Sequence, residues 1–460
     1  MSKIFVPRFC TLSEVQSEYK NKLKTADDAV QIVKTGDRVH YGLFCGIIQD
    51  LDKALAKRVD ELEDVTVYDS IWAYSEPPAI VQADPESKHF KYISTHMSGL
   101  DRSMNKQGAC WFFPVQFREN TKLWAENVEK IDVAMMQVGP MDKNGYFNIG
   151  PQVAEAWGVM GRADKIIVEV NEKQPQTHGI QTTLHISQID IITESSNNEL
   201  PQLIAKDATE TEKKIAAHIV ERIESGTALQ LGIGGMPNYV GSMIKDSDIN
   251  DLSVHTEMFV DAYVELFKAG KITGNKNTHK GKMVFTFAMG SKQVYDFIDD
   301  NPIICCGPVD YVNALEVIAA NDKVVSINSC LQVDLFGQVN SESAGIQHIG
   351  GTGGQLDYVM GAFKSRGGKS FLCTPSVRKN KDGSLVSLIT PRLPEGSIVS
   401  TPRSATHYVV TEFGAVNLKG KTTYERAELL ISIAHPDFRE QLEEEAFNMG
   451  LTRKSSKVLV

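Results

Sequence analysis

One pattern occurs twice in this chain, and it narrows the folds that the chain can adopt. In TADDAVQIVKTGDRVHYG a helical run ends at Gly36 and an alternating strand follows, up to Gly42. In ETEKKIAAHIVERIESGTALQLG the same order brings Gly226 and Gly232, with the same spacing of six residues. Each copy then passes through a second helical segment into a short strand, VTVYD or LSVHT. Helix–strand–helix–strand order with right-handed crossovers predicts an α/β fold of two similar domains in tandem, each with a mainly parallel sheet flanked by helices.

A polar segment in the middle of the chain indicates where the two domains meet. TESSNNELPQ, residues 193–202, combines turn-forming residues with a proline. We therefore predict an N-terminal domain over residues 1–200 and a C-terminal domain over residues 201–460. Further strands are predicted at DVAMMQVGP, KIIVEVN, MVFTFAMG, KVVSIN and HYVVTEFG, and a hairpin at SVRKNKDGSLVS.

Composition argues against several classes of partner. The formal charge of -10 comes from 58 acidic and 48 basic side chains without a basic block, which argues against nucleic acid. The chain lacks a signal-peptide pattern and a run of about 18 apolar residues, so we expect neither secretion nor a membrane span. Seven cysteines without metal-type spacing predict reduced thiols, no metal and a cytoplasmic protein.

Two glycine-rich segments are candidates for ligand-binding loops, because ligands of parallel α/β sheets gather beyond the carboxyl ends of the strands. LGIGGMPN, residues 231–238, directly follows the strand ALQL, and GGTGGQLD, residues 350–357, precedes a helical stretch. Glycine lets backbone approach a ligand, and a following helix directs free N–H groups at an anion. Neither segment has the dinucleotide GxGxxG or the nucleotide GK[ST] pattern. A tight strand-to-helix turn is the alternative for the first segment, and a simple loop for the second.

Four polar residues at or near strand ends could carry chemistry. Glu257 follows LSVHT at the edge where the loop from Gly232 should lie, although an acid in a first helical turn is the alternative. His255 fits better as a core histidine, because LxVxT alternation places it within a packed strand. Asn313 and Glu412 follow strand-like runs and, taken alone, indicate turn or capping residues.

Several longer motifs resemble one family. They are LQLGIGGMPN, VHTEMFVDA, PVDYVNALE, VDLFGQVNSESAG, GGTGGQLDYVMGA, VVTEFGAVNLKG and RAELLISIAHPDFR, with GPMDKNGYFNIGP and KIIVEVNEKQP in the first half. Together they resemble the acetyl-CoA hydrolase/transferase branch of the family I CoA-transferases, and within it the butyryl-CoA:acetate and 4-hydroxybutyrate enzymes. The resemblance covers nearly the whole chain. It implies the CoA-transferase fold, which is also that of sugar-phosphate isomerases.

The resemblance also implies a ping-pong transfer through a glutamyl-CoA thioester, with acyl-CoA and short-chain carboxylates as substrates. The resemblance implies no permanent cofactor. It also implies a homo-oligomer, either a dimer or a tetramer. The implied roles are nucleophile for Glu257, oxyanion donor for Gly354, orientation of the thioester for Asn313, a border of the CoA site for Leu331, a second acid for Glu412, and lining of the CoA and acyl site for Gly232, Ile233, Gly234, Gly235 and Met236.

One departure from the family pattern bears on the substrate. YGLFCGII, residues 41–48, lacks the serine of the SGF-type loop in acetate-specific relatives that use succinyl-CoA. This favours a longer acyl group, with Phe44 and Cys45 shaping its pocket. Butyryl-CoA:acetate transfer is the first hypothesis, 4-hydroxybutyrate transfer and acyl-CoA hydrolysis are alternatives, and a metabolite-binding module is the non-catalytic one.

Overall fold

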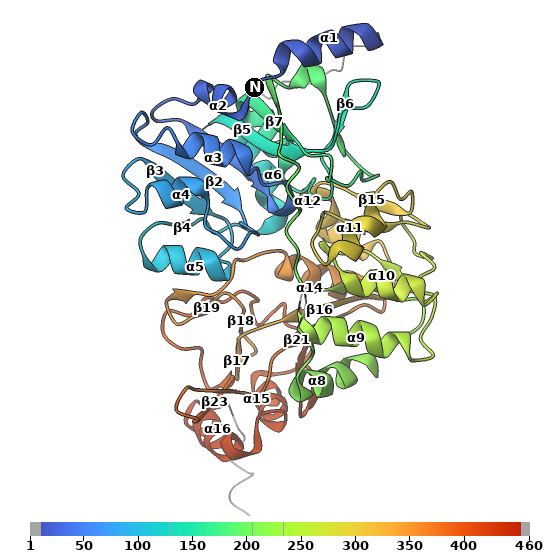
Figure 1. The fold of residues 1–460 in the computed structure, drawn as a ribbon. Coiled ribbons are helices and arrows are strands. Elements are labelled where there is room, and N and C mark those ends of the chain that lie inside the picture. The colour runs from blue at the N-terminus through green and yellow to red at the C-terminus, as the bar shows by residue number, and fades with distance from the viewer. Residues whose placement is uncertain (1–10, 129, 205, 233, 452–460) are drawn as a thin grey trace, which may run out of the picture. The chain divides into compact units, whose positions relative to one another are not determined.

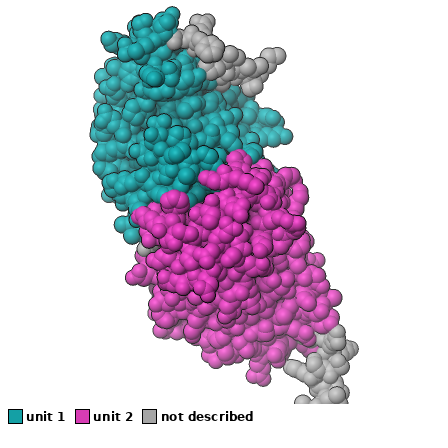
Figure 2. Space-filling model, turned by 90° about the vertical axis from the view of Figure 1, so that its right-hand side faces the viewer, with its two compact units in different colours: residues 1–204, 257–259, 282–312 teal, residues 205–256, 260–281, 313–460 magenta. Residues whose placement is uncertain are grey.

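The computed structural model describes residues 11–451 except 129, 205 and 233 (Figure 1). The chain divides into two compact units (Figure 2). Unit 1 comprises residues 1–204, 257–259 and 282–312, and unit 2 comprises residues 205–256, 260–281 and 313–460. The main change of unit thus falls at the end of the predicted polar break. Two short segments of the second half, however, belong to unit 1, and one of them contains Glu257.

Unit 1 is built on a parallel sheet, which has seven strands within the described residues. Their order is β4-β3-β2-β1-β5-β7-β9. Strand β5 is buried along its whole length, and its successive side chains enter two different apolar clusters. Both faces of the sheet are therefore covered, as expected for parallel strands. The strands are β1 (Arg38–Leu43), β2 (Val65–Ser70), β3 (Phe90–Ser94), β4 (Trp111–Phe112), β5 (Ile131–Val138), β7 (Ala163–Val170) and β9 (Ile191–Glu194).

Unit 2 repeats this plan with a smaller sheet. Among the described residues its order is β11-β10-β16-β21-β25-β26, parallel except for the antiparallel edge strand β26. The strands are β10 (Ala228–Leu231), β11 (Ser253–Val254), β16 (Val324–Ser329), β21 (Lys369–Cys373), β25 (Tyr408–Thr411) and β26 (Gly414–Asn417).

The two sheets confirm the predicted duplication and fold class. The run β2-β1-β5-β7-β9 of unit 1 has the same order along the chain as β11-β10-β16-β21-β25 of unit 2. Gly36 and Gly226 precede the equivalent strands β1 and β10 with φ of 81° and 82°, a conformation that glycine adopts without steric cost. The repeated glycines therefore mark the same left-handed turn in both units.

Helices connect the strands. Those of unit 1 are α1 (Leu12–Lys22), α2 (Ala26–Ala29), α3 (Asp50–Ala56), α4 (Ala79–Ala83), α5 (Gly99–Lys106), α6 (Asn120–Lys122), α7 (Ala156–Arg162), α11 (Lys292–Ile298) and α12 (Val309–Val312). Those of unit 2 are α8 (Glu210–Val220), α9 (Gly235–Lys245), α10 (Asp261–Lys268), α13 (Leu315–Ala319), α14 (Gln355–Lys364), α15 (Thr423–Ser432) and α16 (Pro436–Asn448). Threonine capping boxes start α1, α8 and α15, which is why these polar segments become helical at those points.

The predicted strand MVFTFAMG is divided in the structure. It forms β13 (Met283–Phe285), paired with β15 (Ile304–Cys306), and β14 (Phe287–Ala288), paired with β12 (Met258–Phe259). Thr286 lies between the two pieces because its N–H donates to the Glu257 carbonyl and its hydroxyl to that of Gly307. The predicted hairpin SVRKNKDGSLVS is confirmed as β22 (Val377–Lys379) and β23 (Leu385–Ser387).

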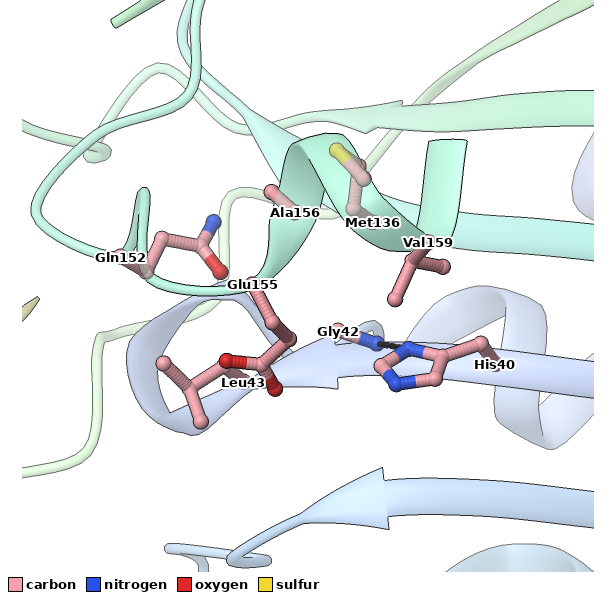
Figure 3. A pocket seen from close by; sticks show the side chains of 8 residues that line it. All are labelled: His40, Gly42, Leu43, Met136, Gln152, Glu155, Ala156 and Val159. Carbon is pink, nitrogen blue, oxygen red and sulfur yellow. Dashed lines mark hydrogen bonds between the residues drawn. The ribbon is translucent and has the colours of Figure 1, made fainter. Parts of the chain in front are cut away.

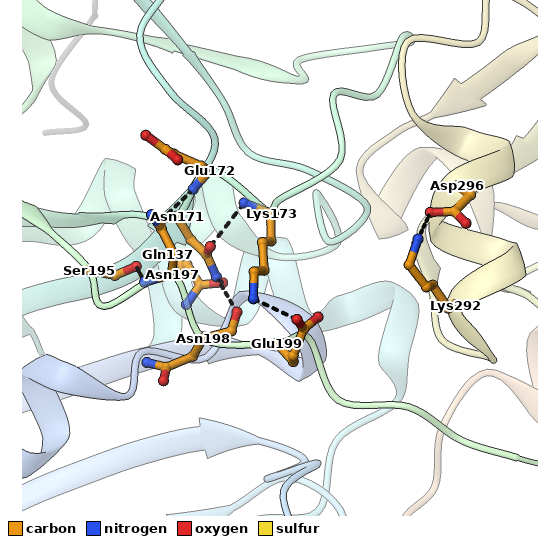
Figure 4. Close-up of polar contacts among 10 residues, drawn as sticks. All are labelled: Gln137, Asn171, Glu172, Lys173, Ser195, Asn197, Asn198, Glu199, Lys292 and Asp296. Atoms are coloured by element: carbon orange, nitrogen blue, oxygen red, sulfur yellow. Dashed lines mark hydrogen bonds and ion pairs between the residues drawn. The ribbon is translucent and has the colours of Figure 1, made fainter.

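The polar break around residues 193–202 is tied to the sheet of unit 1 (Figure 4). Asn171, just after β7, donates from Nδ2 to Gln137 Oε1 at 3.0 Å and to the Asn198 carbonyl at 2.9 Å. The Glu172 N–H donates to Asn197 Oδ1 at 2.9 Å. The composition that predicted a boundary therefore forms an ordered polar margin to unit 1.

Three general features of the described residues bear on function. No helix there has both the length and the apolar character needed to cross a membrane. The His, Cys, Asp and Glu side chains of that part of the chain form no group of three or more suited to a metal ion. Six of its cysteines are buried and free of disulfides.

Candidate active site

Glu257 lies between β11 and β12, at the start of the segment that joins unit 1. Its side chain is partly exposed. Its carbonyl oxygen accepts N–H bonds from Thr286 at 2.9 Å and from Phe287 at 3.3 Å. The next residue, Met258, then pairs with Phe287 in the short β12–β14 ladder. The candidate nucleophile is thus a partly exposed residue whose carbonyl, together with the residue that follows it, is fixed by Thr286 and Phe287.

The first glycine segment lies at the carboxyl end of β10. The Gly232 N–H donates to the Ile327 carbonyl of β16 at 3.0 Å, which continues the ladder between these strands. Gly234 follows with φ of 119°, a backbone conformation that other residues rarely adopt. Ile233 lies outside the described residues. The described part of the segment leads from β10 into α9, and both the turn and the ligand role stay predictions.

Gly235 and Met236 form the first turn of α9. A Cβ at Gly235 would lie 3.1 Å from the Lys206 carbonyl, so this position is tightly packed against the chain before α8. The side chain of Met236 is buried, with 3% of its surface exposed. Within this loop, exposed backbone at the start of α9 is better suited than the Met236 side chain to meet a ligand.

The second glycine segment leads into α14. Gly354 is buried, and its carbonyl accepts the first helical bond from the Tyr358 N–H at 3.1 Å. The next residue, Gln355, donates from Nε2 to the Ser329 carbonyl at 2.8 Å. Because Ser329 ends β16, this helix start lies beside the carboxyl edge of the sheet in unit 2.

Asn313 is buried close to the same helix. It follows α12, and its Nδ2 donates to Asp357 Oδ2 at 3.4 Å. Asp357 stands in the first turn of α14 and is also buried. The amide of Asn313 is therefore fixed relative to the helix that begins after Gly354.

Leu331 and Glu412 follow two other strands of unit 2. Leu331 comes after β16, is partly exposed, and donates its N–H to the Asn340 carbonyl at 2.8 Å. Glu412 comes after β25, and its carboxylate accepts bonds from the Ser376 N–H at 2.8 Å and the Ser376 hydroxyl at 2.6 Å. These contacts give Glu412 a structural function, which is to join the turns after β21 and β25.

Unit 2 thus brings several of the predicted residues to one edge. The segments at Gly232, Leu331 and Gly354 surround the carboxyl ends of the neighbouring strands β10 and β16, and Asn313 is attached to them through α14. Glu412 lies further along the sheet, beyond β21. Glu257 is held in unit 1. The catalytic and binding roles of all these residues stay predictions.

Sequence reasoning missed some residues that position this edge. The Tyr263 hydroxyl on α10 accepts the Leu231 N–H at 2.7 Å, just before Gly232. Thr286 and Phe287, which hold Glu257, were read as ordinary strand residues. The threonine in MVFTFAMG was the available signal of an interruption. His255, by contrast, is fully buried and donates its N–H to Leu229, in agreement with a core position.

A small, mainly apolar cavity lies in unit 1 between β1, β5 and α7 (Figure 3). Its volume is about 10 Å³, and His40 and Glu155 both line it. Gly42 donates its N–H to His40 Nδ1 at 3.0 Å. Burial lowers the pKa of His40 to about 3 and raises the pKa of Glu155 to about 7, the latter against an opposing effect of the Ser70 hydroxyl. His40 is therefore neutral at pH 7, with its proton on Nε2.

Each unit, taken by itself, has a feature suited to acyl chemistry. A partly exposed carboxylate on a fixed backbone can act as a nucleophile. The two long helices α9 and α14 begin at glycine segments on the carboxyl edge of a parallel sheet, where free N–H groups can stabilise negative charge. These features are independent of any bound metal.

Comparison with known proteins shows the family of the chain. Residues 8–203 match the sequence model of the acetyl-CoA hydrolase/transferase N-terminal domain, and residues 290–446 match that of its C-terminal domain. Glu257 falls between the two matched ranges. A crystal structure of RipA from Yersinia pestis has a TM-score of 0.87 and 37% sequence identity, covering 95% of this chain and 99% of its own.

Curated relatives extend along almost the whole chain. A probable butyrate:acetyl-CoA coenzyme A-transferase of Syntrophomonas wolfei is 49% identical, covering 96% of this chain and 98% of the relative. A butyryl-CoA:acetate CoA-transferase of Anaerostipes caccae is 46% identical, covering 96% of this chain and 99% of the relative. A 4-hydroxybutyrate coenzyme A transferase of Clostridium kluyveri is 40% identical, covering 93% of this chain and 98% of the relative. With both family domains matched and identities of this size over nearly its full length, the chain belongs to the acetyl-CoA hydrolase/transferase family.

Proposed function

We propose that this protein is an acyl-CoA:acetate CoA-transferase that converts butyryl-CoA and acetate into butyrate and acetyl-CoA. The observation that carries the proposal is the position of Glu257, a partly exposed residue whose carbonyl is fixed by Thr286 and Phe287. Membership of the family and the names of the two most identical relatives reported above support the same reaction.

The first half-reaction begins with attack of the Glu257 carboxylate on the butyryl-CoA carbonyl. The carbon–sulfur bond breaks, leaving a mixed anhydride and the CoA thiolate. The thiolate then attacks the glutamyl carbonyl of the anhydride, which releases butyrate and leaves a glutamyl-CoA thioester. The thioester energy is thereby conserved on the protein.

The second half-reaction repeats these steps in reverse with acetate. The acetate carboxylate attacks the glutamyl thioester and expels the CoA thiolate, giving an acetyl-glutamyl anhydride. The thiolate attacks its acetyl carbonyl, so that acetyl-CoA leaves and the Glu257 carboxylate is restored. Atoms and charges balance without ATP hydrolysis or a redox partner.

Backbone donors are proposed to stabilise the oxyanions that form in each attack. The Gly354 N–H is the first candidate, and the start of α9 around Gly232–Met236 is assigned to the CoA and acyl groups. Loss of one preorganised oxyanion donor typically lowers the rate by about 10²–10³-fold. Asn313, fixed on Asp357, is assigned to orientation of the thioester. Leu331 is assigned to the border of the CoA site, and Glu412 to a supporting position.

The acyl group is assigned as butyryl, with 4-hydroxybutyryl as the second candidate. The loop after β1 carries Phe44 and Cys45 in place of a serine, and both side chains are buried. An apolar wall offers the 4-hydroxyl no hydrogen bond, and such pockets discriminate a hydroxyl only weakly, by about 10²-fold. Initial rates with the two acyl-CoA substrates at equal concentration measure this preference directly.

Trapping of the covalent intermediate tests the mechanism. The protein is incubated with butyryl-CoA and then with borohydride, which reduces a glutamyl thioester to an alcohol, and peptides are analysed by mass spectrometry. We expect the modification at Glu257. It should be absent when acetate is added before the borohydride, and absent in Glu257→Gln. Butyryl-CoA left unconsumed with Glu257 unmodified would refute the proposal.

Two further measurements separate the alternatives. Acetate accelerates consumption of butyryl-CoA by a transferase, whereas a hydrolase is indifferent to it. A binding module would bind CoA equally well in Glu257→Ala and would lack turnover in both forms. We place the reaction in the cytoplasm, in a homo-oligomer, and sedimentation analysis measures the oligomeric state.

A further inference from the structure

Phe44 adopts a backbone conformation that is unfavourable for its residue type. Its φ is 46°, in the left-handed region where a side chain meets its own backbone. The residue is nevertheless almost fully buried, with 5% of its surface exposed. It lies in the loop after β1, two residues beyond Gly42, whose φ is 84°. Contacts of the buried ring must compensate for this conformation.

The compensating contact is a ring stack with Phe287. The two ring centroids are 4.3 Å apart and the planes differ by 13°. Phe117 meets Phe287 edge-on, with centroids 5.7 Å apart and planes at 83°. Stacked and edge-to-face arrangements are the favourable geometries for aromatic pairs. Phe287 is therefore held from two sides by residues of the first half of the chain.

The adjacent thiol makes a second connection to the same strand. Cys45 Sγ lies 3.8 Å from the Ala288 carbonyl and 3.9 Å from the Pro151 carbonyl. Burial raises the pKa of this thiol to about 12, so that it keeps its proton and can donate to either oxygen. The Ala288 N–H in turn donates to the Pro151 carbonyl at 2.9 Å. Both residues of β14 thus contact the loop after β1, and Ala288 also bonds to Pro151.

The ring that stacks on Phe44 belongs to the residue that holds the candidate nucleophile. The Phe287 N–H donates to the Glu257 carbonyl, and Phe287 pairs with Met258 in the β12–β14 ladder. β12 has two residues, Met258 and Phe259, so few ladder bonds fix it. Thr286 N–H also donates to the Glu257 carbonyl and Met289 N–H to that of Phe259, so the position of β12 depends on Phe287 together with these two bonds.

We infer that Phe44 is a positioning residue for Glu257: its ring fixes Phe287, and Phe287 fixes the backbone from which the nucleophile projects. This inference rests on the proposed function. Attack on a thioester carbonyl requires the reacting atoms to be about 3–3.5 Å apart, and a displacement of about 1 Å can lower a rate by about 10²-fold. The strained loop conformation places the ring where it serves this purpose.

Phe44→Gly isolates the contribution of the ring. Glycine adopts φ of 46° without cost, so the loop keeps its path while the stack is lost. We expect kcat to fall by the same factor, about tenfold or more, with butyryl-CoA and with acetyl-CoA as donor, because a displaced nucleophile affects both donors whereas loss of an acyl-pocket wall affects butyryl-CoA far more. The single-turnover rate of Glu257 labelling should fall by the same factor. Phe44→Tyr, which retains the ring, should recover most of the rate.

Phe90→Leu is the matched control. Phe90 is a buried phenylalanine of β3 in the same unit, 2% exposed, on a strand that does not contact β12 or β14 through any ladder. It should lower thermal stability but leave kcat within about twofold. A positioning role and a general loss of packing thus give different results.

A second ring variant keeps the inference testable if Phe44→Gly does not fold. Phe287→Leu retains the N–H that donates to Glu257 and removes the other half of the stack, and we expect the same loss of kcat. Where both variants fold, the double variant should be no slower than the slower single variant, because the rings act as one unit. Unchanged kcat in either folded single variant, or losses that multiply in the double variant, would overturn the inference. In that event, wild-type labelling at Glu257 would leave the proposed function intact, whereas absent wild-type labelling would refute the function itself.

Discussion

Replacing the buried Glu155 by glutamine should stabilise the protein at alkaline pH and have little effect at acidic pH. The pKa of Glu155 is raised from 4.5 to about 7 by burial. As pH rises past 4.5 the unfolded chain loses this proton first, while the folded chain keeps it until pH is near 7. The folded state then binds more protons than the unfolded state, so stability falls with rising pH across this window.

The size of the effect follows from that shift. A shift of about 2.5 pKa units corresponds to a limiting cost of about 3 kcal/mol, most of it present by pH 8 and only about 1 kcal/mol at pH 5. Glutamine has the same shape and no charge to bury, so Glu155→Gln removes the pH-dependent part. Two other ionisable side chains lie near Glu155. Burial lowers the pKa of His40, which therefore stays neutral, and burial raises the pKa of Asp69.

Thermal unfolding of the two proteins at pH 5 and pH 8 measures this difference. The gain in stability of the variant should be larger at pH 8 by about 2 kcal/mol, which corresponds to a Tm difference of about 4–8 °C for a unit of this size. Glu63→Gln, an exposed site, is the control and should behave alike at both values. If Glu155→Gln changed the stability equally at pH 5 and pH 8, the pKa of Glu155 would not be raised in the folded protein, and the reasoning would be refuted.

Three other changes test separate parts of the structure. Gly42→Ala should destabilise unit 1 by about 1–3 kcal/mol in chemical unfolding, because φ is 84° and the new Cβ would lie 2.9 Å from a backbone oxygen of the same loop. Glu169→Gln should cost about 1–3 kcal/mol, since the carboxylate accepts three backbone N–H bonds at the start of α3, and native-state hydrogen exchange should report the loosened helix. Ser376→Ala removes a hydroxyl from the Glu412 carboxylate and should lower Tm with kcat nearly unchanged; a kcat loss beyond about tenfold would instead assign Glu412 to the reaction.

The tandem α/β fold was predictable because short-range patterns of apolar residues and glycines determine its strands and turns. Runs such as DVAMMQVGP and KIIVEVN are apolar on both faces, which buried parallel strands require, and they became β5 and β7. The glycines at 36 and 226 carry the same left-handed turn in both copies. Helix starts were equally local, since threonine and glutamate three residues apart satisfy each other.

The surroundings of Glu257 were not predictable in the same way. A strand of two residues is determined by its partner, and the partner of β12 lies almost 30 residues further along the chain in β14. Local alternation cannot indicate such a pairing. The burial of Glu155 was not predictable for a related reason, because the cavity that it lines combines residues of β1 and β5 with residues of its own helix α7. The position of Glu257 at a strand end was visible in the sequence, but its attachment to unit 1 was not.

The interleaving of the two units also has a consequence for synthesis. Unit 1 takes residues 257–259 and 282–312 from far beyond its first 204 residues, and with them β12, β13, β14 and β15. While the ribosome adds the residues between 204 and 312, the nascent chain exposes the apolar surfaces that these short strands later cover. At about 5–20 residues per second this interval lasts about 5–20 s. Fragments that stop at residue 204 lack those strands, so unit 1 is completed only after residue 312 has been synthesised.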